Sequence, residues 1–321
     1  MSGDEGGAAS TRRAVSEEEQ AVVRRLSGGV GWPTVLFALA LTAIEGGVIA
    51  LWAIGVMPMW AGFIINSLVS YAWYTVHHEA THKNISGRQP RWRWLEAGCG
   101  NLAGFALQLE FAGYARNHLR HHAHTNSPSD PDLAVKGPMW QLPIKWLVAT
   151  VFGVVGALPG GQRIVARMVT KLGVPLPAAE SDRDKADRAR LRRFAQLGLV
   201  VLVITIPFGW FWPAFLLWWL PSRVGIFFLM VLFQWLPHFP FDRTDRFGAT
   251  RITRFYGSTW LLLQQDRHLI HHLYPQIPWY RYRKTFNELR PLLVANGAII
   301  EGTGTTPHVP IQLHERVKAE V

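Results

Sequence analysis

The sequence predicts an all-α integral membrane fold, with four transmembrane helices in two hairpins and a cytoplasmic helical cap. Three observations support this prediction: a composition depleted in charge, two pairs of long apolar segments, and positive charge on one side of those segments only. Of the 321 residues, 49% are hydrophobic, 17% are charged, and 15 are tryptophan. Soluble domains average roughly 25% charged residues. The composition therefore favours a protein that lies in lipid.

The apolar segments come as two pairs. In the first pair, residues 34–54 are followed after a brief turn by residues 60–76. In the second pair, one helix is expected over residues 194–212, and the next ends near Trp235. A helix that crosses a bilayer needs about 20 mostly apolar residues. Each pair therefore predicts a helical hairpin whose two ends lie on the same side of the membrane.

Two segments between the hairpins are weaker candidates for spans. Residues 95–114 are semi-apolar, and polar side chains interrupt them, so we expect a helix in the membrane interface. Residues 139–161 are more apolar, but Pro143 and Lys145 shorten the apolar run. We expect that this second segment does not cross the bilayer alone.

Positive charge orients the predicted spans. Arg24 and Arg25 precede the first hairpin, an arginine-rich linker over residues 178–193 precedes the second, and further arginines follow it. The turn between the first two helices carries neither lysine nor arginine. By the positive-inside rule, the two termini and the whole middle region are cytoplasmic. We expect a disordered N-terminus over residues 1–30, a membrane domain over 31–298 and a polar C-terminal tail over 299–321.

The formal net charge of +11 has two possible explanations. A nucleic-acid-binding protein would carry basic stripes that attract phosphate. Here the basic residues cluster beside apolar segments instead, as expected of cytoplasmic flanks that lie next to anionic lipids. We therefore expect membrane lipids and acidic proteins as partners, and no nucleic acid.

Thirteen histidines are present, and eight of them fall in three compact groups. The groups are His78-x-x-x-His82, His118-x-x-His121-His122 and His268-x-x-His271-His272. Residues three or four apart share one face of a helix, so each group presents imidazoles to one point. Neutral imidazole is a ligand suited to iron, zinc, copper and nickel. All three groups lie on the same predicted face of the membrane, and eight ligands suffice for two metal ions.

Several motifs together resemble the membrane fatty acid desaturase superfamily, which includes lipid desaturases, hydroxylases and carotenoid-ring oxygenases. The spacing of the three histidine groups is similar to that family's three boxes. The sequence HHAHTN followed by Asp130-Pro-Asp132 resembles the tail of the second box, and HLIHHLYPQIPWYRY resembles the third. WLPH, which ends at His238, resembles an additional histidine found after the last span.

The resemblance implies a histidine-ligated di-metal site of two ferrous ions, with O2 as co-substrate. Its expected ligands are His78, His82, His118, His121, His122, His268, His271 and His272, with His238 as a ninth. Gln234 lies one helical turn before His238 and is a candidate for a supporting position. Asp130, Asp132 and His124 are further candidates, since metal-bound imidazoles usually donate a hydrogen bond to a second partner. His77, His308 and His314 are not expected to bind metal.

The same resemblance implies an O2-dependent oxidoreductase that hydroxylates or desaturates a C–H bond of a lipid. The third box and WLPHFPF look closest to carotenoid-ring hydroxylases, so we expect hydroxylation of a carotenoid β-ring. A fatty acyl desaturase is the alternative within the family. A dinucleotide-binding glycine motif or a fused haem module is not found in the sequence, so a separate ferredoxin, rubredoxin or cytochrome-type electron donor is expected.

A different class of enzyme could use one of these groups. The residues from His78 to His82 read HEATH, which satisfies the H-E-x-x-H signature of zinc metalloproteases with Glu79 as general base. A catalytic zinc in such an enzyme takes only three protein ligands. An intramembrane zinc protease would leave most of the other histidines without a role.

Overall fold

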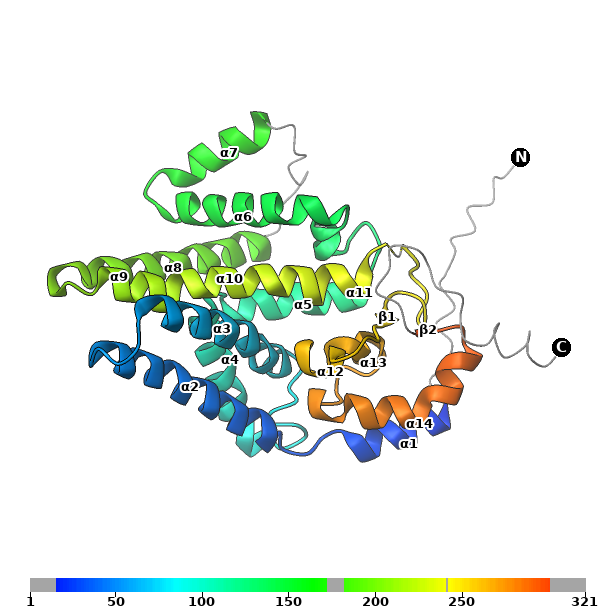
Figure 1. Cartoon of the computed structure of the whole chain (residues 1–321). Helices are drawn as coiled ribbons and strands as arrows, with labels where there is room; N and C mark the ends of the chain where they lie inside the picture. The colour runs from blue at the N-terminus through cyan, green and yellow to red at the C-terminus, as the bar shows by residue number, and fades with distance from the viewer. Residues whose placement is uncertain (1–15, 172–181, 241, 301–321) are drawn as a thin grey trace, which may run out of the picture.

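The computed structural model describes residues 16–171, 182–240 and 242–300 (Figure 1). Most of these residues are helical, and the long helices lie roughly along one direction, with shorter helices gathered at one end. Within these described ranges, four helices are long and apolar enough to cross a membrane: Trp32–Ala53, Met139–Ala157, Asp182–Phe208 and Phe211–His238. The predicted all-helical character of the membrane part is confirmed.

The first pair of apolar segments forms α2 (Trp32–Ala53) and α3 (Met59–Thr81), which pack against each other. Pro33 lies in the first turn of α2, where its missing N–H is not needed. The predicted second span corresponds to α3, which has 23 residues but is not among the four most apolar helices. Its polar residues Asn66, Ser67 and Ser70 are buried inside the protein. The reason is that α3 packs between α2, α4 and α10 instead of facing lipid all round.

Gly225 of α10 (Leu220–Leu229) allows this close packing. A Cβ atom at Gly225 would lie 2.8 Å from Cβ of Ser70 on α3, a distance too short for two carbon atoms. The two helices therefore approach closely because this residue has no side chain.

The middle region corrects one prediction. In place of one interfacial helix over residues 95–114, the chain forms α4 (Arg93–Leu107) and then α5 (Phe111–His124). Gln108 ends α4 in the left-handed conformation, with φ 53°. Glu110 begins α5, because its carboxylate accepts hydrogen bonds from the backbone N–H groups of Ala112 and Gly113. Two helical turns, η1 (Pro90–Trp92) and η2 (Pro131–Val135), flank this pair.

Residues 139–161 form the helical turn η3 (Met139–Gln141) and α6 (Leu142–Ala157), after which α7 (Gly161–Lys171) turns back over α6 (Figure 1). Pro143 starts α6 instead of shortening it, since it lies in the first turn. By length and composition alone, Met139–Ala157 therefore meets the requirement for a span, contrary to the effect expected of Pro143 and Lys145. The C-terminal end of α6 lies beside the middle of α8, where Gln196 Nε2 donates to the carbonyl of Ala157 at 2.9 Å.

The second pair of apolar segments begins earlier than predicted. The helix α8 (Asp182–Ile204) already includes the charged residues expected in a linker, while residues 178–181 lie outside the described part. The short η4 (Ile206–Phe208) leads into one long helix over Phe211–His238. Its segments are α9 (Phe211–Ala214), the π-helical η5 (Phe215–Trp219), α10, the π-helical η6 (Met230–Trp235) and α11 (Leu236–His238).

Arg223 lies near the middle of that long helix, yet its charge is not left in lipid. Its guanidinium group donates to the carbonyls of Leu107 at 2.7 Å and Gln108 at 3.2 Å. These are carbonyl groups at the C-terminal end of α4, which have no partner within their own helix. Arg223 therefore caps α4, and its charge complements the negative end of the helix dipole.

The C-terminal part forms the end where the short helices gather. Its elements are β1 (Arg251–Ile252), α12 (Ser258–Leu261), η7 (Gln265–Arg267), α13 (His268–Leu273), η8 (Trp279–Arg281), α14 (Tyr282–Ala295) and β2 (Ile299–Ile300). The two strands pair in parallel, with Arg251 opposite Ile299. The predicted tail over 299–321 therefore starts too early, because Ile299 and Ile300 are buried strand residues. Residues 301–321 lie outside the described part.

The prediction of a disordered N-terminus over residues 1–30 is wrong for the residues that the structure describes. They form α1 (Glu17–Leu26), whose start is a capping box between Ser16 and Glu19. Val22 and Leu26 are buried in one apolar cluster with residues of α13 and α14. Helix α1 is stable because its apolar side packs on residues that are distant in the sequence.

Candidate metal centre

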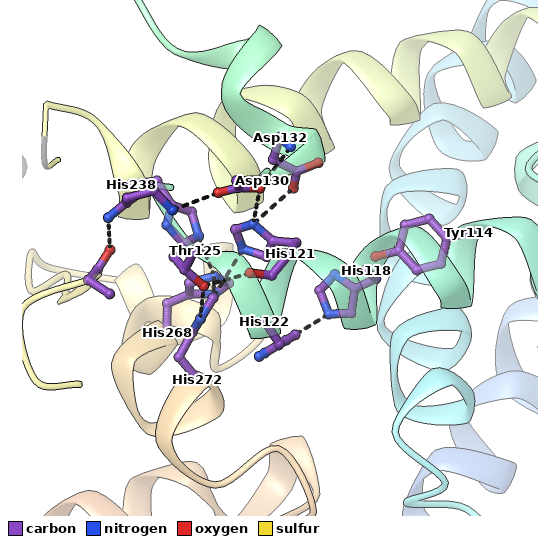
Figure 2. Close-up of polar contacts among 12 residues, drawn as sticks. Tyr114, His118, His121, His122, Thr125, Asp130, Asp132, His238, His268 and His272 are labelled. Atoms are coloured by element: carbon purple, nitrogen blue, oxygen red, sulfur yellow. Dashed lines mark hydrogen bonds and ion pairs between the residues drawn. The ribbon is translucent and has the colours of Figure 1, made fainter. Parts of the chain in front are cut away.

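Four parts of the chain carry histidines to one end of the helices. His78 lies in the last turn of α3, and His82 follows directly after this helix. The other seven histidines lie on α5, α11 and α13. In Figure 2, the side chains from α5, α11 and α13 point toward one another. All nine predicted ligands take part in two groups of neighbouring nitrogen atoms.

The first group consists of His78, His82, His118, His122 and His271, whose candidate ligand atoms all lie within 4.8 Å of one another. Nε2 of His118 lies 3.0 Å from Nε2 of His82 and 3.0 Å from Nε2 of His122. Nε2 of His271 lies 3.0 Å from Nε2 of His78. The same ring nitrogen of each histidine therefore points to a shared centre.

The second group consists of His121, His238, His268 and His272, again within 4.8 Å. Nε2 of His268 lies 3.1 Å from Nε2 of both His238 and His272. Nε2 of His121 lies 3.3 Å from Nε2 of His272. Two adjacent residues therefore belong to different groups, His271 to the first and His272 to the second.

The outward nitrogens of several rings have their own partners. Nδ1 of His121 lies 2.9 Å from Oδ1 of Asp130, and Nδ1 of His271 lies 3.0 Å from the Tyr282 hydroxyl. Nδ1 of His272 lies 3.4 Å from Oγ1 of Thr125. A proton held at Nδ1 leaves the Nε2 lone pair facing inward, as in metal-bound histidines.

This donor set fits metal ions. Several Nε2 atoms at 3.0–3.3 Å cannot all satisfy one another as hydrogen-bond donors and acceptors, since each neutral ring has one proton. A cation between them would instead accept every lone pair. Burial, together with the neighbouring histidines, lowers the pKa of His118, His122, His271 and His272 well below the usual value. The rings are therefore neutral at physiological pH, the form that binds metal.

The other predicted residues occupy different places. Asp130 is buried and accepts from His121, whereas Oδ2 of Asp132 lies 3.8 Å from the same nitrogen. Burial raises the pKa of Asp132, while a hydrogen bond with Gln234 acts in the opposite direction. Gln234 thus contacts Asp132, the neighbour of the His121–Asp130 pair. His124 is exposed and belongs to neither nitrogen group.

Two aromatic hydroxyl groups beside the site were not singled out from the sequence. Tyr282 contacts His271, and the ring of Tyr114 stacks on His118 with centroids 5.4 Å apart. Tyr282 falls inside the HLIHHLYPQIPWYRY segment, but α13 ends at Leu273, so helical spacing does not relate Tyr282 to His271. Tyr114 lies four residues before His118 on α5, so helical spacing could have identified its contact, whereas the contact of Tyr282 could not be identified in this way.

The zinc-protease interpretation is wrong. Glu79, its candidate base, is fully buried, with Oε2 accepting from Trp279 N at 3.2 Å and Oε1 from Asn84 Nδ2 at 3.4 Å. Both carboxylate oxygens are therefore engaged outside the histidine groups. A catalytic zinc uses three protein ligands, whereas the two groups have five and four histidines.

Membrane-length helices with two histidine clusters at one end define a class of integral membrane proteins with a candidate two-metal centre. A model of the fatty acid desaturase family matches residues 49–303, and the chain belongs to this family. The chain is 26% identical over 268 residues to a beta-carotene ketolase of Paracoccus sp. (strain N81106 / MBIC 01143), covering 75% of this chain and 90% of that protein. It is also 26% identical over 230 residues to a beta-carotene ketolase of Paracoccus sp. (strain PC1), covering 68% and 74%.

These similarities confirm the resemblance found in the sequence and make the protein an oxygen-dependent oxidoreductase. The family uses a di-iron centre, and the histidine clusters needed for one are present. The family and the apolar helices also identify an integral membrane protein.

Proposed function

We propose that the protein oxidises a C–H bond on the β-ring of a carotenoid, using two iron ions held by its nine clustered histidines. The observation that supports this most strongly is the convergence of five Nε2 donors at one centre and four at the next. The similarity to two beta-carotene ketolases supports the choice of substrate over a fatty acyl chain.

The chain's own residues would prepare the site. One iron would be held by His78, His82, His118, His122 and His271, and the other by the second group. When bound, the irons would supply the electrons that activate O2 for attack on an unactivated C–H bond. Asp130, Thr125 and Tyr282 orient the imidazoles through Nδ1. Burial of the rings keeps bulk water away from the reacting groups.

The expected product is an alcohol or the ketone that follows from it. Hydroxylation converts a ring CH2 to CHOH, and consumes one O2, two electrons and two protons with release of one water. A second hydroxylation at the same carbon would give a geminal diol, which loses water to form a ketone. The substrate's position relative to the irons decides which carbon reacts.

We also propose the membrane arrangement. The two hairpins would enter from the cytoplasm, and the histidine clusters would lie in a cytoplasmic cap. The contact between Ala157 and Gln196 supports a re-entrant α6–α7 pair, since α6 ends beside the middle of α8 and α7 turns back. An acidic ferredoxin, rubredoxin or cytochrome-type donor would then meet a protein of net charge +11.

Expression in a bacterial host that makes β-carotene tests the function. Pigments and fatty acids would be analysed together, with a His271→Ala chain as control. Hydroxylated or keto carotenoids that depend on His271 are the expected result. New double bonds in the fatty acids, with unchanged carotenoids, would favour the fatty acyl desaturase instead.

A further inference from the structure

An exposed aromatic segment lies between β1 and α13, outside the histidine clusters. Tyr256 is fully exposed, Trp260 is 84% exposed, and Leu261 is 54% exposed. Large apolar side chains gathered in this way usually mark a surface that contacts a partner or a membrane.

A pocket of about 370 Å³ opens beside this segment. Its lining includes three arginines, two hydroxyl side chains and one exposed indole: Arg254, Arg267, Arg283, Ser258, Thr259 and Trp260. Small-molecule sites typically have volumes of about 300–1,000 Å³. The pocket is therefore large enough for a phosphate-containing group.

The pocket has excess positive charge. Asp266 is its one acidic lining residue, and this buried carboxylate already pairs with Arg267 at 2.7 Å and accepts from Thr259 Oγ1 at 2.8 Å. Three guanidinium groups and one carboxylate therefore line the pocket, a lining that suits an anion.

The segment is joined to the membrane part of the protein. The Tyr71 hydroxyl of α3 donates to the carbonyl of Leu261 at 2.7 Å. In Figure 1, α12 lies beside the C-terminal part of α3, at the end where the histidine-bearing helices meet. Tryptophan and tyrosine are enriched where a protein passes through the headgroup layer. The exposed aromatic side chains therefore suit the bilayer surface better than bulk water.

We propose that this pocket binds the phosphate of an anionic phospholipid headgroup, while Tyr256, Trp260 and Leu261 enter the adjoining lipid layer. Guanidinium groups match phosphate oxygens with paired hydrogen bonds. The apolar side chains at the rim favour a lipid over an acidic protein, because a lipid offers an anion and an apolar region side by side. The proposal requires membrane residence and is independent of the substrate.

Lipid retention by the purified full-length protein tests this proposal. The protein in detergent would be incubated with equal amounts of phosphatidylglycerol and phosphatidylcholine, and retained lipids would be counted by native mass spectrometry. We expect preferential retention of phosphatidylglycerol, weakened about tenfold by combined Arg254→Gln and Arg283→Gln changes, since each removes a charge-assisted hydrogen bond. Arg283→Lys should retain part of the binding.

Arg290→Gln is the matched control, because Arg290 is an exposed arginine two turns further along α14 and does not line the pocket. It should leave lipid retention unchanged, and all variants should keep wild-type iron content and unfolding temperature. Equal retention of both lipids, or equal effects of the pocket and control variants, would overturn the proposal. The proposal would also be overturned if the pocket variants kept phosphatidylglycerol binding but lost binding to an acidic ferredoxin. That result would assign the pocket to the electron donor.

Discussion

The imidazole of His121 lies between the carboxylate of Asp130 and the imidazole of His272, another member of the second histidine group. Its Nδ1 lies 2.9 Å from Oδ1 of Asp130, and its Nε2 lies 3.3 Å from Nε2 of His272. Asp130 in turn accepts hydrogen bonds from the backbone N–H groups of Asn126 and Asp132. The carboxylate is thus held in place before it orients the ring.

Replacing Asp130 should therefore weaken metal binding without removing a ligand. For Asp130→Asn we expect iron affinity to fall about 10–100-fold, the usual effect of removing such a partner. Asp132→Asn should have a smaller effect, because Asp132 lies 3.8 Å from the same nitrogen. Iron release to a competing chelator measures both. Equal release rates in the two variants would contradict the orienting role of Asp130.

The metal content follows from the two nitrogen groups. Protein purified without chelator should hold close to two irons per chain, measured by elemental analysis with Mössbauer spectroscopy. The physical reason is that five and four imidazoles occupy two separate centres. One zinc per chain and no iron would be incompatible with the proposed oxidation.

Single histidine substitutions should differ in their effect on activity and iron content, according to whether the ring belongs to one of the two groups. His271→Ala removes a buried nitrogen donor from the first group, so we expect loss of activity and of about one iron per chain. His124→Ala is the matched control on α5, since this ring is exposed and joins neither group. His308→Ala and His314→Ala should also have little effect. The same iron loss in all four proteins would show that the grouping is incorrect.

The sequence allowed the histidines to be recognised, but not how they divide. Helical spacing identifies His118 and His122 as neighbours, and the structure places both in the first group. His121 joins the second group, and so does His272, although His271 beside it joins the first. Adjacent residues on a helix point in different directions, and which centre each reaches depends on how α5 and α13 pack. That packing is set by contacts far apart in the chain.

Contacts between residues far apart in the sequence also explain why the N-terminal helix was not predicted. Its charged composition suggested disorder, yet the Tyr274 hydroxyl donates to Glu19 Oε1 at 2.6 Å across 255 positions of sequence. Likewise, the break between α4 and α5 depends on the left-handed backbone of Gln108, which composition did not indicate. Local hydropathy predicted the long helices well because lipid imposes their length.

The docking of α1 should depend on pH through Glu19. Burial disfavours its charge, but hydrogen bonds from Arg246 and Tyr274 prevail and lower its pKa from 4.5 to about 2. Because the folded-state pKa is depressed, this stabilisation is complete above about pH 4.5 and is lost as the pH falls toward 2. Glu19→Gln should cost about 1–3 kcal/mol near neutral pH.

Thermal unfolding of the detergent-solubilised protein over a pH series measures this effect. The difference between the wild type and Glu19→Gln should shrink with acidification. Glu18→Gln serves as control, since Glu18 is exposed on the same helix. A difference between the wild type and Glu19→Gln that stays constant down to the lowest pH would rule out the ionised carboxylate as its cause.

The proposed sidedness can be tested by cysteine labelling in intact cells. Cys99 is the single cysteine of the chain, so a Cys99→Ser background accepts one probe at a time. We expect Asp182→Cys and Lys136→Cys to be protected from an impermeant reagent, and Gly209→Cys between α8 and α9 to be labelled. Labelling of Asp182→Cys from outside would contradict the cytoplasmic position of the α8 start.

Arg223 has a consequence for how the long helix Phe211–His238 enters the membrane. An arginine at the centre of a helix costs roughly 2.5–3.5 kcal/mol on insertion into lipid, and this residue lies well inside the long helix Phe211–His238. Its partners, the carbonyls of Leu107 and Gln108, were synthesised more than a hundred residues earlier. We therefore expect that α4 is already in place beside the insertion site when this helix leaves the translocon. The charge would then pass directly from an aqueous channel to a helix terminus, without first entering lipid alone.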